Sequence, residues 1–122
     1  MKNYLKNRVK AFGHAFRGVR DLLKGTPHAV IHLVMALLAI LLGVVLRISS
    51  GEWLAIIIVI GMVLASETMN SAIETLADRV TLERDERIRK VKDLSAAAVL
   101  LAAIAALVVG AVIFVPKLMG LL

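Results

Sequence analysis

Residues 94–115, with the sequence LSAAAVLLAAIAALVVGAVIFV, form the longest uncharged run of the chain. A helix needs about 20 mostly apolar residues to cross a bilayer, and this run is long enough to do so. A second run, AVIHLVMALLAILLGVVL over residues 29–46, carries one histidine and no formal charge. Hydrophobic residues make up 60% of the chain, which is above the usual share for a soluble domain. The two runs therefore predict transmembrane helices.

A third apolar run, over residues 53–66, continues as a helical pattern to about Ala77. It is long enough to cross a bilayer only if Glu67 and Glu74 lie within the membrane or beside it. We therefore expect an all-α integral membrane protein with one domain over residues 1–122. Its expected helices are an N-terminal interfacial helix at residues 1–25 and transmembrane helices near residues 28–48, 53–78 and 94–115.

Basic residues mark one side of the membrane. Seven of the 15 Lys and Arg residues precede Thr26, and six lie from Arg79 to Lys92. With three transmembrane helices, the N-terminus and the connection between the second and third helices lie on the same side. Because cytoplasmic segments carry an excess of Lys and Arg, we expect the N-terminus in the cytoplasm and the C-terminus outside.

The N-terminal segment has an apolar stripe at helical spacing. Its members recur at steps of four, three, four, three and four: Leu5, Val9, Phe12, Phe16, Val19 and Leu23. This spacing places them on one face of a helix, with Lys and Arg on the flank and the far side. A basic amphipathic helix of this kind lies in the headgroup layer of a membrane. Two roles are open, an anchor held by anionic lipid or a lid over an interfacial active site, and the pattern alone favours the anchor.

Two breaks separate the helices that precede residue 80. The first is Gly25-Thr26-Pro27. Because Pro is tolerated in the first turn of a helix, Thr26 is expected to be the N-cap of the first transmembrane helix. The second break is Ser-Ser-Gly-Glu at residues 49–52, which is expected to form a tight external turn before Trp53.

Four polar residues share one stripe of the second transmembrane helix, at spacings of three, four and four. They are Glu67, Asn70, Glu74 and Asp78, and Ser71 borders them. A carboxylate within a bilayer is expensive and usually functional. The alternative is a set of packing hydrogen bonds with the carboxylates protonated, which Asn and Ser would provide at a lower cost. We therefore interpret the stripe as a functional site.

Position along the helix separates the roles of the carboxylates. Glu67 is the deepest, and it lies about 10 Å along the axis from Glu74. A carboxylate at lipid depth suits a general base that acts on a lipid hydroxyl. The more exposed Glu74 suits Mg²⁺, which takes oxygen ligands. Lys92 and Asp93 open the third transmembrane helix at the same interface, where Lys can meet phosphate oxygens, so the set fits phosphoryl transfer.

Absent motifs narrow the chemistry further. The chain has no Cys, which excludes disulfides, thiolate metal sites and a cysteine nucleophile. It has no Walker A sequence and no Gly-rich kinase loop, so a nucleotide site would be built differently.

Because three helices enclose little interior in which to hide a polar site, we expect the chain to form an oligomer.

The sequence ETMNSAIE at residues 67–74, then Asp78, then Lys92-Asp93 before an Ala-rich helix, resembles the signature of prokaryotic diacylglycerol kinases. This family of small integral membrane proteins includes the undecaprenol kinases. The resemblance covers nearly the whole chain. It implies a homotrimer in the bacterial cytoplasmic (inner) membrane, with active sites on the cytoplasmic face that neighbouring chains share. It also implies that ATP and Mg²⁺ are used to phosphorylate a lipid alcohol, with no nucleic-acid partner.

The same resemblance assigns roles to individual residues. Glu67 corresponds to the catalytic base, and Glu74 to a ligand of the metal that bridges ATP. Catalytic support is implied for Asn70, Lys92 and Asp93. The residues implied to lie beside ATP are His14, Glu74, Asp78, Glu83, Arg84, Asp85, Lys92 and Asp93. The residues implied to meet the lipid are Phe12, Phe16, Arg17, Glu67 and Ser95.

One position departs from the family pattern. Relatives carry a second metal-binding Glu in a segment resembling T-E-R-N-F-x-x-H, and the matching stretch here is GTPHAVIH at residues 25–32. Thr26 therefore occupies the Glu position, while the closing His32 is retained. We expect a metal site with one carboxylate fewer. We also expect His28 to be a surface residue and His32 to pack or form a hydrogen bond.

The substrate and two rival functions stay open. Diacylglycerol, giving phosphatidic acid, and undecaprenol, giving undecaprenyl phosphate, are both compatible with apolar helix faces. The ending GAVIFVPKL at residues 110–118 and the turn at Glu52-Trp53 are more similar to the undecaprenol kinases. The rival functions are a small proton-coupled transporter, with Glu67 as the proton carrier, and an inactivated relative of the kinase. A transporter does not need four polar groups that reach the cytoplasmic edge.

Overall fold

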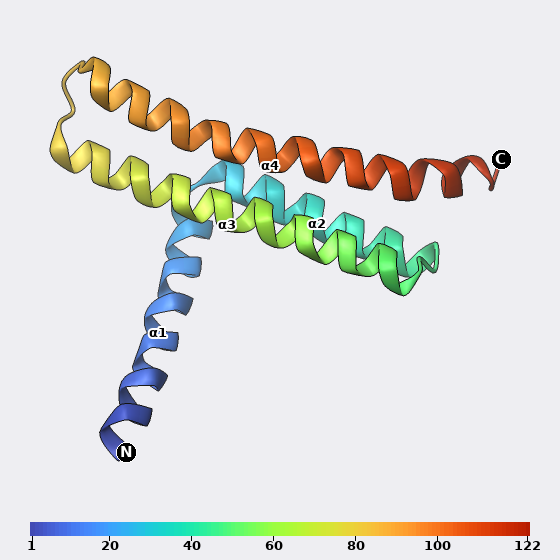
Figure 1. The fold of residues 1–122 in the computed structure, drawn as a ribbon, viewed down its shortest axis with the longest axis horizontal. Helices are drawn as coiled ribbons and strands as arrows, with labels where there is room; N and C mark the ends of the chain where they lie inside the picture. Colours follow the sequence, from blue (N-terminus) through green and yellow to red (C-terminus); the bar gives the residue numbers. More distant parts are fainter.

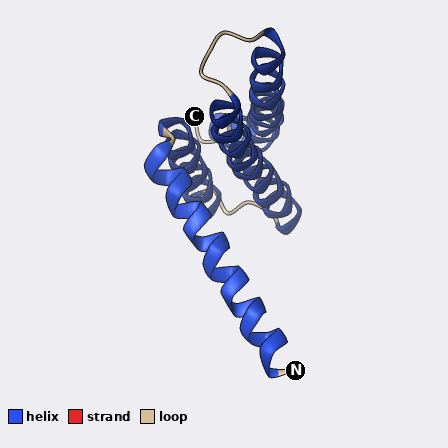
Figure 2. Ribbon diagram, turned by 90° about the vertical axis from the view of Figure 1, so that its left-hand side faces the viewer, coloured by secondary structure: helices blue, strands red, loops and turns tan.

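The computed structural model describes all residues from 1 to 122 and consists of four helices without a strand. They are α1 (Lys2–Gly25), α2 (Pro27–Val45), α3 (Ser50–Val80) and α4 (Glu86–Met119). Helices α2, α3 and α4 lie alongside one another, and α1 projects away from them (Figures 1 and 2). The all-α prediction is confirmed.

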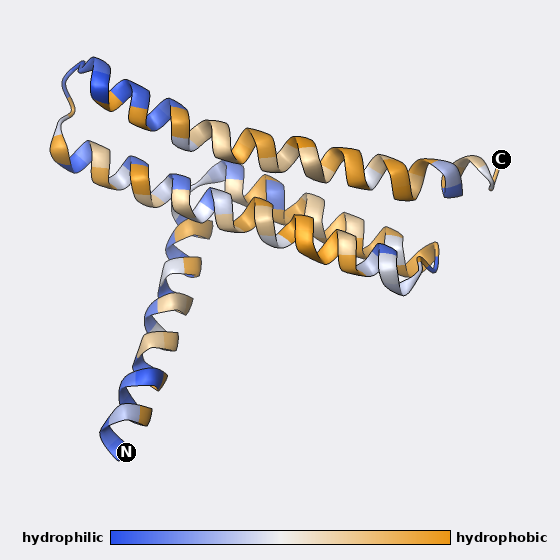
Figure 3. Cartoon of the chain, viewed as in Figure 1, coloured by the Kyte–Doolittle hydropathy of each residue, from blue (hydrophilic) through white to orange (hydrophobic).

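Three of the helices, α2, α3 and α4, are long and apolar enough to cross a membrane, as predicted from the apolar runs. Helix α4 extends well beyond its predicted span at residues 94–115, whereas α3 exceeds residues 53–78 by only three residues at its start and two at its end. The 31 residues of α3 and the 34 residues of α4 correspond to about 46 and 51 Å at 1.5 Å per residue. The hydrocarbon core of a bilayer is only about 30 Å thick. The excess carries the charged residues next to the α3–α4 connection, where the ribbon is mostly hydrophilic (Figure 3).

The connection between α2 and α3 lies at residues 46–49, three residues earlier in the chain than predicted. Instead of forming a turn, residues 50–52 are the first residues of α3, and Ser49 is its N-cap. The Glu52 N–H donates to Ser49 Oγ at 3.2 Å, and the Ser49 N–H donates to Glu52 Oε2 at 2.8 Å. This reciprocal pair is a capping box. The expected turn at residues 49–52 is therefore wrong. The S-x-x-E spacing of Ser49 and Glu52 is typical of a capping box and could have predicted the start of α3.

The hydrophobic core cluster of the bundle lies at the end that holds this α2–α3 connection, which we call the turn end. An apolar cluster there joins α3, α4 and the α2–α3 connection: Ile48, Ile56, Ile113 and Phe114. Lys117, near the end of α4, donates to Glu52 at 3.0 Å. A partly buried ion pair thus fastens the last turns of α4 to the first turn of α3. The opposite end, at residues 81–85, is called the loop end.

Helix α1 leaves its apolar residues uncovered. Phe12 and Phe16 are exposed, and Leu22 is the only buried residue of the helix. Figure 3 shows apolar residues recurring along one side of α1. An uncovered apolar stripe is consistent with a helix at the lipid surface, and this location stays a prediction.

Gly43 sets how closely α2 approaches the start of α3. A Cβ atom at this position would lie 2.9 Å from Trp53 Cη2 and 3.0 Å from Ile48 Cδ1. We predict that Gly43→Ala lowers the free energy of unfolding by about 1–3 kcal/mol, because the indole ring must move. Thermal unfolding in detergent micelles measures the effect. The matched control is Gly61→Ala in α3, where an added Cβ has no neighbour within 4 Å. Equal stability of the two variants would contradict the prediction.

Candidate active site

The predicted polar stripe is present on one continuous helix, and its burial within the chain falls toward the loop end. Glu67 is 3% exposed. Asn70 is half-buried, and Glu74 and Asp78 are exposed. The order of burial follows the predicted order of depth, from the base candidate to the residue nearest water.

Glu67 faces α2. The Nε2 atom of His32 lies 3.2 Å from Oε1 of Glu67, and no other basic group lies within 4 Å of this carboxylate. The side chain of His32 is 24% exposed and that of Glu67 is 4% exposed. His32 was expected to pack or to form a hydrogen bond, and the structure places its ring beside the Glu67 carboxylate. Its partner was not predicted, although His32 is the only polar residue in the apolar run at residues 29–46.

Two polar contacts connect the stripe to α4. The hydroxyl of the buried Ser95 donates to Asn70 Oδ1 and lies 3.3 Å from the carbonyl oxygen of Lys92. The Lys92 ammonium lies 2.5 Å from Asp78 Oδ1. Asn70 and Asp78 are about two turns apart on α3, so these contacts fix the register of the two helices beside the site.

The other residues predicted to lie beside ATP at the loop end have contacts outside the polar stripe of α3 or are exposed. Asp93 pairs with Arg89 on the exposed side of α4. Asp85 caps α4 by accepting from the Arg87 and Ile88 N–H groups at 2.8 and 3.0 Å. The Glu83 N–H donates to Thr81 Oγ1 at 3.0 Å. Arg84 is exposed in the same connection.

Thr26 lies beside the stripe. Its hydroxyl shares a hydrogen bond of 3.1 Å with the hydroxyl of Ser71. Thr26 is the N-cap of α2 as predicted, but its side chain makes no capping hydrogen bond. The prediction that the Thr26 side chain caps α2 is therefore wrong, because its hydroxyl is hydrogen-bonded to Ser71 of α3 instead. The position that departs from the family pattern is thus next to the polar stripe.

Glu74 is the free carboxylate of the stripe. It forms no ion pair or side-chain hydrogen bond within the chain, and no group of three or more Asp, Glu or His side chains could hold a metal ion. Mg²⁺ usually keeps several waters and takes one or two carboxylates alongside phosphates. One free, exposed carboxylate fits that ligand chemistry as a partial site.

The predicted residues of α1 are not brought to the stripe within one chain. Phe12, His14, Phe16 and Arg17 are all exposed, and α1 points away from the other helices (Figure 2). Their proposed contacts with ATP and lipid stay predictions. His28, in the first turn of α2, is exposed, as expected of a surface residue.

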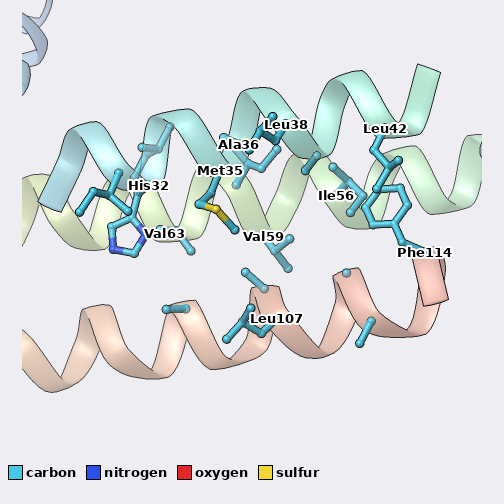
Figure 4. Close-up of a pocket in the computed structure, with 18 of the residues that line it drawn as sticks. His32, Met35, Ala36, Leu38, Leu42, Ile56, Val59, Val63, Leu107 and Phe114 are labelled. Atoms are coloured by element: carbon cyan, nitrogen blue, oxygen red, sulfur yellow. The ribbon is translucent and has the colours of Figure 1, made fainter. Parts of the chain in front are cut away.

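An apolar cavity of about 690 Å³ lies between α2, α3 and α4. Of its 19 lining residues 17 are hydrophobic, and His32 is the only one with a polar side chain. His32 and Phe114 lie at opposite ends of the cavity in Figure 4. The cavity therefore reaches from the closely packed turn end to the imidazole that contacts Glu67. An apolar cavity of this kind can hold a hydrocarbon chain, with the polar head of the lipid at the end where His32 lies.

Comparison with known proteins gives a consistent result. The family model described as prokaryotic diacylglycerol kinase matches residues 13–114. Undecaprenol kinase of Bacillus subtilis is 31% identical over 117 residues, which are 96% of this chain and 95% of that protein. Diacylglycerol kinase of Escherichia coli K12 is 31% identical over 100 residues, 82% of each chain. Diacylglycerol kinase of Pseudomonas aeruginosa is 33% identical over 94 residues, 77% of this chain and 76% of that protein.

The matches confirm the resemblance that was read from the motif at residues 67–74, and they favour the kinase over the transporter alternative. The family match spans the polar stripe, its contacts with α4, the whole of α2 and α3, and α4 up to Phe114. The chain therefore belongs to the prokaryotic diacylglycerol kinase family and is a lipid kinase of the membrane.

Proposed function

We propose that this kinase transfers the γ-phosphoryl group of ATP to the hydroxyl of a membrane lipid alcohol, with undecaprenol preferred over diacylglycerol. The observation that carries the proposal is the position of Glu67, a buried carboxylate in contact with His32, which lines one end of an apolar cavity. The preference for undecaprenol is supported by the match to the Bacillus subtilis kinase, which covers 96% of this chain against 82% for the Escherichia coli kinase.

In the proposed reaction Glu67 acts as the general base. Its carboxylate accepts the proton of the lipid hydroxyl while the hydroxyl oxygen forms a bond to the γ-phosphorus and the bond to ADP breaks. Proton transfer by a positioned side chain contributes about 100- to 10,000-fold to a rate. The apolar surroundings of Glu67 keep bulk water away from this step.

The polar residues nearer the loop end are proposed to neutralise the negative charge of the ATP phosphates. Lys92, held by Asp78 at 2.5 Å, presents an ammonium group that can meet phosphate oxygens. Mg²⁺, when bound, neutralises the charge of the β- and γ-phosphates, and Glu74 would be its protein ligand. The Asn70–Ser95 hydrogen bond keeps α4 in register beside the base.

We further propose a homotrimer in the bacterial inner membrane with the loop end on the cytoplasmic face. A single chain leaves α1 uncovered and provides one free carboxylate to the metal, which supports a site completed by a neighbouring chain. The basic residues of α1 and of the loop end support a cytoplasmic location for both. In that arrangement α1 would bring Phe12, Phe16 and Arg17 to the lipid, and His14 to the nucleotide.

The direct test is phosphoryl transfer by the purified protein in lipid micelles. Radiolabelled ATP and Mg²⁺ are supplied with undecaprenol or diacylglycerol in parallel reactions. We predict transfer to both lipids and a higher kcat/KM for undecaprenol. A higher kcat/KM for diacylglycerol would contradict the substrate preference, and no transfer to either lipid would identify an inactivated relative.

Glu67→Gln keeps the shape of the side chain and removes the base. We predict that it lowers kcat by about 100- to 10,000-fold while the protein still assembles and binds lipid. The matched control is Glu52→Gln, the same change at the turn end of the same helix, for which we expect wild-type kcat. More than a tenth of wild-type turnover in Glu67→Gln would rule out the role of general base.

The Mg²⁺ requirement tests the metal site. We predict that Glu74→Ala raises the Mg²⁺ concentration needed for half-maximal rate. Thr26→Glu is expected to lower it, because a second carboxylate is added beside the stripe. Thr26→Glu also removes the hydrogen bond to Ser71, so thermal stability is measured on the same preparation. Midpoints equal to that of the wild type in both variants would mean that other residues hold the metal.

A further inference from the structure

His32 lies where the apolar cavity meets the buried base. It is the only polar side chain that lines the cavity, and Figure 4 shows its ring at one end of that space. On its other side, its Nε2 atom is 3.2 Å from Glu67 Oε1. One imidazole therefore borders both the space suited to a hydrocarbon chain and the carboxylate proposed to take the proton.

His32 is the one polar side chain that contacts the Glu67 carboxylate. The Glu67 side chain has three rotatable bonds, and no other basic group lies within 4 Å of it. No side-chain hydrogen bond within the chain holds its oxygens. Within the packing that buries the side chain, the contact with His32 is therefore the specific polar interaction that can orient the carboxylate.

The backbone that carries His32 is fixed relative to α3 on both sides. Thr26, six residues earlier, is hydrogen-bonded to Ser71 of α3. Gly43, further along α2, is in close contact with Trp53 of α3. An imidazole on a helix held at two points can hold a flexible carboxylate in one orientation.

We propose that His32 is a positioning residue for the base, whose Nε2 edge directs the Glu67 carboxylate toward the end of the apolar cavity. The inference rests on the proposed function, because it requires Glu67 to be the base. A displacement of about 1 Å in a reacting group can lower a rate about 100-fold. Loss of the contact should therefore lower kcat and leave the KM for ATP unchanged, since ATP is expected at the loop end.

A pair of amide substitutions tests this contact. The amide nitrogen of Gln reaches the place of the imidazole Nε2, whereas that of Asn reaches only the place of Nδ1. We expect His32→Gln to keep a near-wild-type kcat. His32→Asn and His32→Leu are expected to lose about 10- to 100-fold in kcat with an unchanged KM for ATP. Because the amide pair differs by one methylene, it decides the question even where His32→Leu fails to fold.

The matched control is the neighbouring exposed histidine, His28. The variants His28→Asn and His28→Leu repeat the same changes one turn earlier on α2, and wild-type kcat is expected of both. Equal kcat for His32→Gln and His32→Asn, or losses as large in the His28 variants, would overturn the positioning role. These results leave the proposed function standing if the wild type is active and Glu67→Gln is not. A wild-type chain that phosphorylates no lipid alcohol would refute the proposed function, and this inference with it.

Discussion

Glu67 is a carboxylate in the middle of a helix that crosses a membrane, and most of the surrounding structure accommodates it. Insertion of an ionisable side chain at the centre of a transmembrane helix costs about 2.5–3.5 kcal/mol on translocon scales. The helix around Glu67 is otherwise strongly apolar, which keeps it in the bilayer. The bundle buries the side chain to 3% exposure and places the imidazole of His32 against it. A buried polar side chain that has a polar partner is less costly than one that has none.

The two ends of the bundle hold different kinds of contact. The turn end holds the apolar cluster, the Ser49 capping box, the close approach at Gly43 and the Lys117–Glu52 pair. The loop end holds exposed carboxylates and short polar contacts between α3 and α4. The apolar core thus lies at one end, while the polar groups that fix the register of α3 and α4 lie at the other.

Much of this arrangement was predictable from local patterns. The apolar runs identified all three spans, and the spacing from Glu67 to Asp78 identified the stripe, because both depend only on the geometry of one helix. The contact between His32 and Glu67 was not predictable in the same way. It depends on the rotation and register of α2 against α3, and no periodicity within either helix encodes these. For the same reason the Thr26 side chain was expected to cap its own helix, whereas it bonds to Ser71.

The length of α3 has a consequence for the membrane itself. Glu67 and Asp78 are 11 residues apart on one unbroken helix, so about 16 Å separates them along its axis. If Glu67 lies at lipid depth, as proposed, one rigid element spans the boundary between hydrocarbon and water and keeps Glu67 at a constant distance from the aqueous Asp78. Lipids that thin or thicken the bilayer move that boundary along the helix, while the spacing of the carboxylates stays the same. Bilayer thickness thereby becomes a physical variable that can tune such an enzyme without a regulatory ligand or a second binding site.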